Sequence, residues 1–132
     1  MSPPNVVAVV GRNPKMLEAL DRLLPAFGLY VETYASVESF MYGAAMTDAT
    51  CALIDTPLDE ERGFELLRRL RAGGFTVPFV FLIDSEEDTI RLQARTLKRV
   101  AFVHKPFFSE QLIEAIRSAM ASCRDEPCTG AA

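Results

Sequence analysis

Cys51-Ala-Leu-Ile-Asp55 is the stretch that decides the fold: an apolar run that ends in a carboxylate and is followed directly by Thr56-Pro57. A short, continuous apolar run bounded by turn residues is typical of a strand buried on both faces of a sheet. In open α/β sheets, ligands and chemistry are found at the carboxyl ends of the strands. Asp55 is therefore predicted to lie at the mouth of such a sheet.

Further strand-like segments alternate with helical patterns on both sides of this stretch. The strand-like segments are Val6–Val10, Tyr30–Tyr34, Val77–Ile83 and Val100–His104. Apolar spacing and capping residues predict helices over Pro14–Phe27, from Ser36 to about Ala44, over Gly63–Arg71, from Ser85 to about Lys98, and from Ser109 to about Met120. Alternation of this kind predicts a parallel sheet with helices on both faces. We expect an α/β, three-layer, doubly wound (βα)5 sandwich with the flavodoxin-like strand order 2-1-3-4-5.

Length and composition restrict the class of protein. The chain has 132 residues and a net charge of −4, which argues against duplex DNA as the main partner. We expect one domain over residues 1–121 and a flexible tail over 122–132, with no output domain. No apolar run approaches the ~20 residues of a membrane span, so we expect a cytoplasmic protein without membrane contact. The three cysteines lack the spacing of a zinc site.

Polar residues follow four of the predicted strands and are expected to meet at one edge of the sheet. These strand ends carry Gly11-Arg12-Asn13, Asp55-Thr56, Ile83-Asp84-Ser85 and Lys105-Pro106. A carboxylate can attack a phosphoryl group, and a nearby lysine can hold phosphate oxygens as a point charge. Asp55 and Lys105 are therefore the candidate site residues.

The chain resembles the receiver domain of bacterial two-component response regulators from about Val6 to Ala121. The resemblance is carried by Leu53-Ile-Asp55, by Gly63-Phe-Glu-Leu-Leu67 and by Ala101-Phe-Val-His-Lys105-Pro-Phe107. It implies that Asp55 accepts a phosphoryl group from the phosphohistidine of a histidine kinase and that Lys105 contacts this phosphate. It also implies that Phe102 occupies the aromatic switch position.

The chain departs from the family pattern at the metal and switch positions. The two acidic Mg²⁺ ligands of the family correspond to Gly11 and Arg12, and its switch Thr or Ser corresponds to Ile83. Asp55, Arg12 and Lys105 sum to a charge of +1, and one carboxylate beside two cations is a poor Mg²⁺ site. We expect Mg²⁺ binding to be weak or lost, and we hypothesise that Arg12 pairs with Asp55 in the metal's place.

Two residues after the fourth strand leave alternatives open. Asp84 restores some acidity to the pocket, or it serves as a favourable acid at the start of the next helix. Ser85 supplies the hydroxyl that Ile83 lacks, or it caps that helix together with Asp88.

The resulting prediction is a non-enzymatic, single-domain, atypical response regulator that acts by protein–protein contact, with Mg²⁺-dependent phosphorylation of Asp55 impaired or absent. The alternative is a receiver that still accepts a phosphoryl group at Asp55. A small-ligand-binding flavodoxin-like protein is a remote alternative, because Gly11-Arg-Asn-Pro14 is not a Gly-rich phosphate loop. The resemblance implies a sensor histidine kinase or a phosphotransfer protein as partner. It also implies a candidate face for partners and a homodimer, formed by the fourth helix, residues 100–104 and the fifth helix.

Overall fold

The computed structural model shows a five-stranded parallel sheet. It describes residues 5–43, 49–55, 60–83, 97, 99–105 and 108–125. The strands are β1 (Asn5–Val10), β2 (Leu29–Tyr34), β3 (Cys51–Asp55), β4 (Phe79–Ile83) and β5 (Val100–His104). They lie in the order β2-β1-β3-β4-β5, and each pairs in parallel with its neighbours. The predicted fold class and strand order are confirmed.

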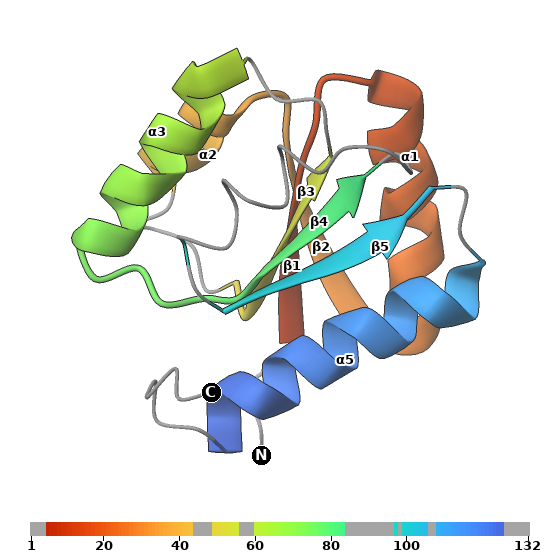
Figure 1. Ribbon diagram of the computed structural model, residues 1–132. Helices are drawn as coiled ribbons and strands as arrows, with labels where there is room; N and C mark the ends of the chain where they lie inside the picture. Colours follow the sequence, from red (N-terminus) through yellow and green to blue (C-terminus); the bar gives the residue numbers. More distant parts are fainter. Residues whose placement is uncertain are drawn as a thin grey trace.

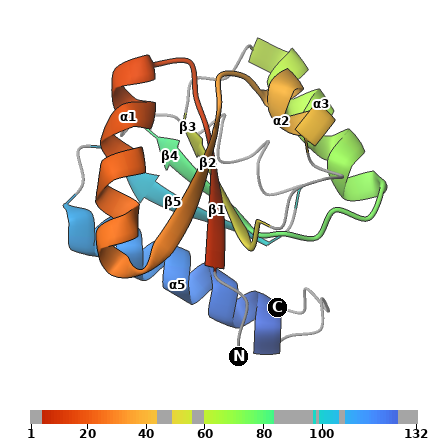
Figure 2. The same ribbon diagram turned by 180° about the vertical axis from the view of Figure 1, so that it is seen from behind.

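Helices cover both faces of this sheet. α2 and α3 lie on one face and α1 and α5 on the other, as the two opposite views show (Figures 1 and 2). The helices are α1 (Pro14–Leu23), the 3-10 helix η1 (Leu24–Phe27), α2 (Val37–Gly43), α3 (Glu60–Ala72) and α5 (Ser109–Asp125).

A buried apolar cluster fills each of the two interfaces between helices and sheet. Phe40 of α2 and Leu67 of α3 belong to the first cluster, with alternate residues of β1, β3 and β4. Leu20 of α1 and Leu112 and Ile116 of α5 belong to the second, with the intervening residues of the same strands. The central strands therefore carry apolar side chains on both faces, which is why their sequences read as continuous apolar runs.

The helix predicted over Pro14–Phe27 is divided into α1 and the 3-10 helix η1. The side chain of Asn13 caps α1 by accepting a hydrogen bond from the backbone N–H of Lys15 at 3.0 Å. The α-helix stops at Leu23, and Pro25 lies within the 3-10 turn that follows. Gly28 closes this turn with a φ of +82°, a left-handed conformation that suits glycine.

Two other helices are longer than predicted. α3 begins at Glu60, not at Gly63, and α5 continues past Met120 to Asp125, so the expected domain boundary at Ala121 falls within a helix. Ser109 is the first residue of α5 and not its cap. The backbone N–H of Phe108 donates to the side-chain oxygen of Gln111 at 2.8 Å, so a glutamine reaching back from the first turn caps this end.

Some predictions fall outside the described residues. They concern the helix from Ser85 to Lys98, of which only Leu97 is described, and residues 126–132 of the tail. Within the described part of the chain, none of the helices is long and apolar enough to span a membrane.

Candidate functional site

Asp55 is the last residue of β3, the central strand of the sheet. β1 and β4 flank it, with Ile54 opposite Val10 and Asp55 opposite Leu82. The side chain of Asp55 is only 11% exposed. A carboxylate with this little access to water needs a partner that neutralises or solvates it.

Lys105 is that partner. It directly follows β5, and its backbone N–H donates to the carbonyl of Ile83 at 2.8 Å, which extends the β4–β5 pairing by one residue. Its Nζ lies 2.8 Å from Oδ1 of Asp55, and its side chain is 20% exposed. Apart from this ion pair, Oδ1 accepts no hydrogen bond from a described residue. The structure thus brings the two predicted site residues together as a largely buried ion pair.

Gly11, the residue that follows β1, lies close to Asp55. Its backbone N–H donates to the carbonyl of Tyr34 at 3.0 Å, which holds the end of β1 against β2. A Cβ atom added at Gly11 would lie 3.1 Å from Cβ of Asp55 and 3.5 Å from its Oδ2. Cβ contacts at 3.1 Å are rarely seen, so glycine allows the end of β1 to approach Asp55 more closely than another residue would.

Arg12 does not take the role that the sequence suggested. Its side chain is exposed, and the ion pairs between described residues include none that joins Arg12 to Asp55. The predicted Arg12–Asp55 pair is therefore wrong for this conformation. The cation that neutralises Asp55 is Lys105, because the backbone hydrogen bond after β5 places it over the end of β3.

Ile83 and Phe102, the residues predicted to occupy the switch positions, lie on the α2–α3 side of the sheet. Ile83 is fully buried and belongs to the apolar cluster on that face. Phe102 is partly buried against the same cluster, and its ring stacks on Phe81 at a centroid distance of 5.9 Å and an interplanar angle of 26°. Apolar packing therefore occupies the position where the family has a hydroxyl.

The described residues at this edge do not fit Mg²⁺. This ion needs several oxygen ligands in near-octahedral geometry, usually including carboxylates. The part of the chain that the structure describes contains no group of three or more His, Cys, Asp or Glu side chains that could hold a metal ion. Asp55, the carboxylate at this strand end, already pairs with an ammonium group. Asp84 and Ser85, the residues with open alternatives, lie outside the described residues.

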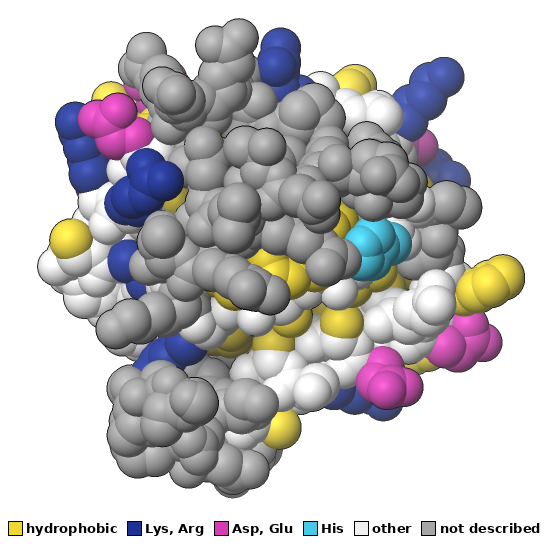
Figure 3. Space-filling model, in the orientation of Figure 1, with side chains coloured by type: hydrophobic (Ala, Val, Ile, Leu, Met, Phe, Trp, Pro, Cys, Tyr) yellow, Lys and Arg dark blue, Asp and Glu magenta, His cyan; other side chains and the backbone are white. Residues whose placement is uncertain are grey.

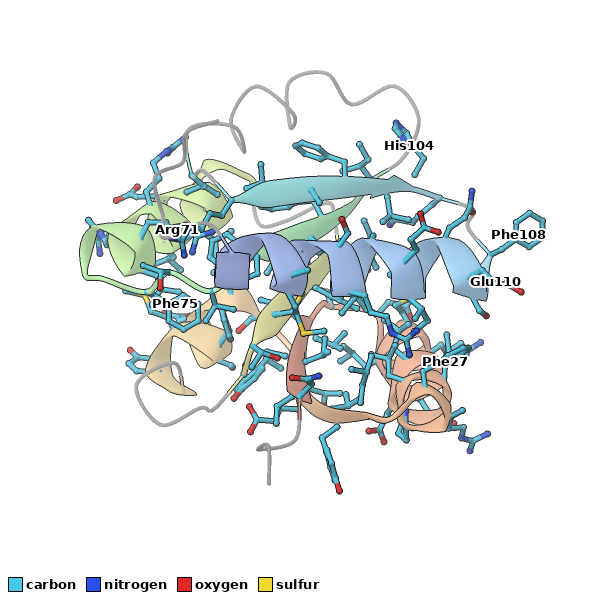
Figure 4. The ribbon with its side chains drawn as sticks, turned by 90° about the horizontal axis from the view of Figure 1, so that it is seen from below. Phe27, Arg71, Phe75, His104, Phe108 and Glu110 are labelled. Atoms are coloured by element: carbon cyan, nitrogen blue, oxygen red, sulfur yellow. The ribbon has the colours of Figure 1, made fainter. Side chains whose placement is uncertain are left out.

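A surface groove runs between β5 and α5. It has a volume of about 460 Å³, and its lining includes Phe102, His104, Gln111 and Glu114. His104, the chain's single histidine, is exposed at the end of β5 (Figures 3 and 4).

The sequence did not indicate every contact of the site. From the sequence, Gly11 indicates only a missing acidic residue, and the structure shows that it also lies close to Asp55. A glycine at the end of a strand is a general signal of such a close backbone approach. The stacking of Phe81 on Phe102 had no signal beyond two aromatic residues on neighbouring strands.

Comparison with known proteins agrees with the fold. Residues 7–117 match the family described as the response regulator receiver domain. Response regulator protein TodT of Pseudomonas putida is 28% identical over 116 residues, which cover 88% of this chain and 51% of TodT. Transcriptional regulatory protein FixJ of Bradyrhizobium diazoefficiens is 25% identical over 114 residues, which cover 86% of this chain and 56% of FixJ. The chain spans about half the length of the curated relatives it matches.

Solved structures show the same architecture. The crystal structure of FixJ-N has a TM-score of 0.81 at 25% identity, covering 92% of this chain and 96% of its own. Vibrio cholerae chemotaxis protein CheY4 has a TM-score of 0.79 at 18% identity, covering 89% and 99%, and this likeness supports the fold alone. The match to the family covers most of the chain and includes Asp55 and Lys105. This chain belongs to the family of response regulator receiver domains.

Proposed function

We propose that this receiver domain acts in two-component, phosphorelay signal transduction by protein–protein contact, with Mg²⁺-dependent phosphorylation of Asp55 impaired or absent. The observation that carries this proposal is that Gly11, which lies close to Asp55, and Arg12 stand where the resemblance calls for two acidic Mg²⁺ ligands. In this proposal the domain is an atypical receiver, has no enzymatic activity of its own and works in the cytoplasm.

The electrostatics of the strand ends support the proposal. Phosphoryl transfer builds negative charge on the transferring group, and metal ions normally neutralise it. Here Asp55 supplies one negative charge and Lys105 and Arg12 supply two positive charges. A divalent cation entering this environment meets a carboxylate that is already paired with an ammonium group. Phosphorylation that depends on Mg²⁺ should therefore be slow.

The proposed partner is a sensor histidine kinase or a phosphotransfer protein. The groove of about 460 Å³ between β5 and α5 offers a surface for such contact, and the same face is the candidate surface for a homodimer. The net charge of −4 favours a protein over DNA as the partner of this domain.

Incubation with acetyl phosphate and Mg²⁺, followed by intact-mass measurement, tests the proposal. We expect no gain of a phosphoryl group, and a receiver that retains both acidic ligands should gain one in a parallel reaction. The Asp55→Asn variant is the control for the site of modification. A phosphoryl gain in the native chain that is absent from Asp55→Asn would overturn the proposal.

That outcome would favour the second candidate function, a receiver phosphorylated at Asp55. The specific observation in its favour is that Asp55 and Lys105 are both present and 2.8 Å apart, so a phosphate on Asp55 would have an ammonium group within reach. The same mass measurement decides between the two candidates.

A further inference from the structure

Arg71 links three segments of the chain by hydrogen bonds, at the end of the sheet where β4 and β5 begin. Asp55 lies at the opposite end of the strands. Arg71 lies in the last turn of α3, and its guanidinium group donates hydrogen bonds to backbone carbonyls on both sides. Nη1 donates to Phe75 at 2.8 Å and to Val77 at 2.6 Å, in the connection that leads into β4. Nε donates to Leu97 at 2.7 Å and Nη2 to Arg99 at 3.4 Å, in the connection that leads into β5.

The surroundings of Arg71 suit a guanidinium group in particular. Its Cζ lies 4.0 Å from the centre of the Phe79 ring, which is fully buried at the start of β4. A planar guanidinium can stack on an aromatic ring while its N–H groups bond in the ring plane, whereas an ammonium group cannot do both. Figure 4 shows Arg71 and Phe75 close together near the end of α3.

Arg99 also links the two connections, because it precedes β5 and bonds to residues at the start of β4. Its Nη1 donates to the carbonyl of Thr76 at 2.6 Å, and its own carbonyl accepts from the N–H of Phe79 at 3.0 Å. Its backbone has a φ of +50°, in the left-handed region that residues other than glycine rarely adopt. Such a conformation persists where the surroundings hold it, and here the contacts of Arg71 and Arg99 do so.

β5 needs this anchoring because it is an edge strand. Among the described strands only β4 pairs with it, and its first three residues are only partly buried. Edge strands have fewer hydrogen bonds than central ones and open more readily. Arg71 donates to the carbonyl of Arg99, the residue immediately before β5, and Arg99 donates to the carbonyl of Thr76 in the connection before β4.

We propose that Arg71 is a positioning residue which, together with Arg99, fixes the start of β5, the strand that carries Phe102 and leads to Lys105. The inference does not depend on the phosphorylation of Asp55. It concerns the local opening of one strand, which distinguishes it from a general contribution of Arg71 to stability.

Amide hydrogen exchange of Arg71→Lys, followed residue by residue, tests this proposal. The variant keeps the positive charge and loses most of the carbonyl contacts. We expect the N–H of Phe79, which bonds to the carbonyl of Arg99, and the amides of β5 to exchange about tenfold faster. Amides of Val7–Val10 in β1 should change much less. Arg69→Lys is the matched control, because Arg69 is on the same helix and pairs with Glu65 at the surface.

Two results would overturn the proposal. One is an equal increase at Phe79 and in β1, which would mean that Arg71 only contributes to overall stability. The other is an Arg71→Lys exchange pattern that matches the pattern of Arg69→Lys. If Arg71→Lys does not fold, Arg99→Lys gives the same comparison, because it removes the bond to Thr76 and leaves Arg71 in place.

Discussion

Replacing Lys105 by methionine tests the buried ion pair most severely. The change keeps a side chain of similar length with an apolar stem, and it removes the ammonium group that lies 2.8 Å from Oδ1 of Asp55. Removing one partner of a fully buried ion pair costs about 3–5 kcal/mol, because the other charge remains buried without compensation. Asp55 and Lys105 are 11% and 20% exposed, so water can solvate the remaining carboxylate in part. We therefore expect a loss of about 2–3 kcal/mol in the free energy of unfolding.

Urea unfolding at neutral pH measures this loss. With a slope of about 1–3 kcal/mol per molar urea, the midpoint should fall by about 0.7–3 M. Lys15→Met is the matched control, because Lys15 is exposed on the first turn of α1, and it should change the free energy of unfolding by less than about 0.5 kcal/mol.

The double variant Asp55→Asn, Lys105→Met completes the test. Once the carboxylate is replaced by a neutral amide, loss of Lys105 no longer leaves a buried charge. The double variant should therefore be more stable than Lys105→Met alone. If Lys105→Met matches Lys15→Met, or if the double variant is the less stable of the two, the assignment of a stabilising buried pair is refuted.

Two further changes probe the contacts around the pair. Gly11→Ala should lower the free energy of unfolding by about 1 kcal/mol, because the Cβ of the alanine would lie 3.1 Å from Cβ of Asp55. Urea unfolding measures this loss, and a variant of equal or greater stability would contradict the prediction. Phe102→Ala should cost about 1–3 kcal/mol through lost burial and lost stacking on Phe81, whereas Phe108→Ala, at a side chain 75% exposed, should cost less than about 0.5 kcal/mol. Thermal unfolding compares these two variants, and equal losses would show that the stacking of Phe102 contributes nothing.

The strands could be predicted from the sequence because strands that are buried on both faces consist almost entirely of apolar residues. Cys51–Asp55 and Val100–His104 have the predicted bounds, and the others differ by at most two residues. Parallel strands buried on both faces need apolar side chains at nearly every position, which makes the pattern easy to detect. The order of the strands then followed from the alternation with helices.

The ends of two helices were predicted less well, although the sequence contains signals for them. Glu60 and Glu61 are acidic residues of the kind that favour the first turn of a helix, and α3 begins there. Pro127 is the first helix-breaking residue after Ser109, and α5 continues almost to it. The prediction ended this helix early because the apolar periodicity weakens after Met120.

The partner of Asp55 could not be chosen by counting charges. The sequence placed two cations, Arg12 and Lys105, at the strand ends, and either could neutralise the carboxylate. The choice depends on the backbone hydrogen bond from Lys105 to Ile83, which is a tertiary contact without a sequence pattern. The carbonyl contacts of Arg71 are of the same kind, because backbone acceptors leave no mark on residue identity.

A Mg²⁺ titration followed by the backbone amide signals of Gly11, Ile54 and Asp55 tests the central claim most directly. These amides belong to the strand ends where the family binds its metal. Because Asp55 is paired with Lys105 and β1 contributes no acidic side chain at residue 11 or 12, we predict no saturable shift of these signals in the millimolar range. A saturable shift at low millimolar Mg²⁺ that disappears in Asp55→Asn would contradict the account.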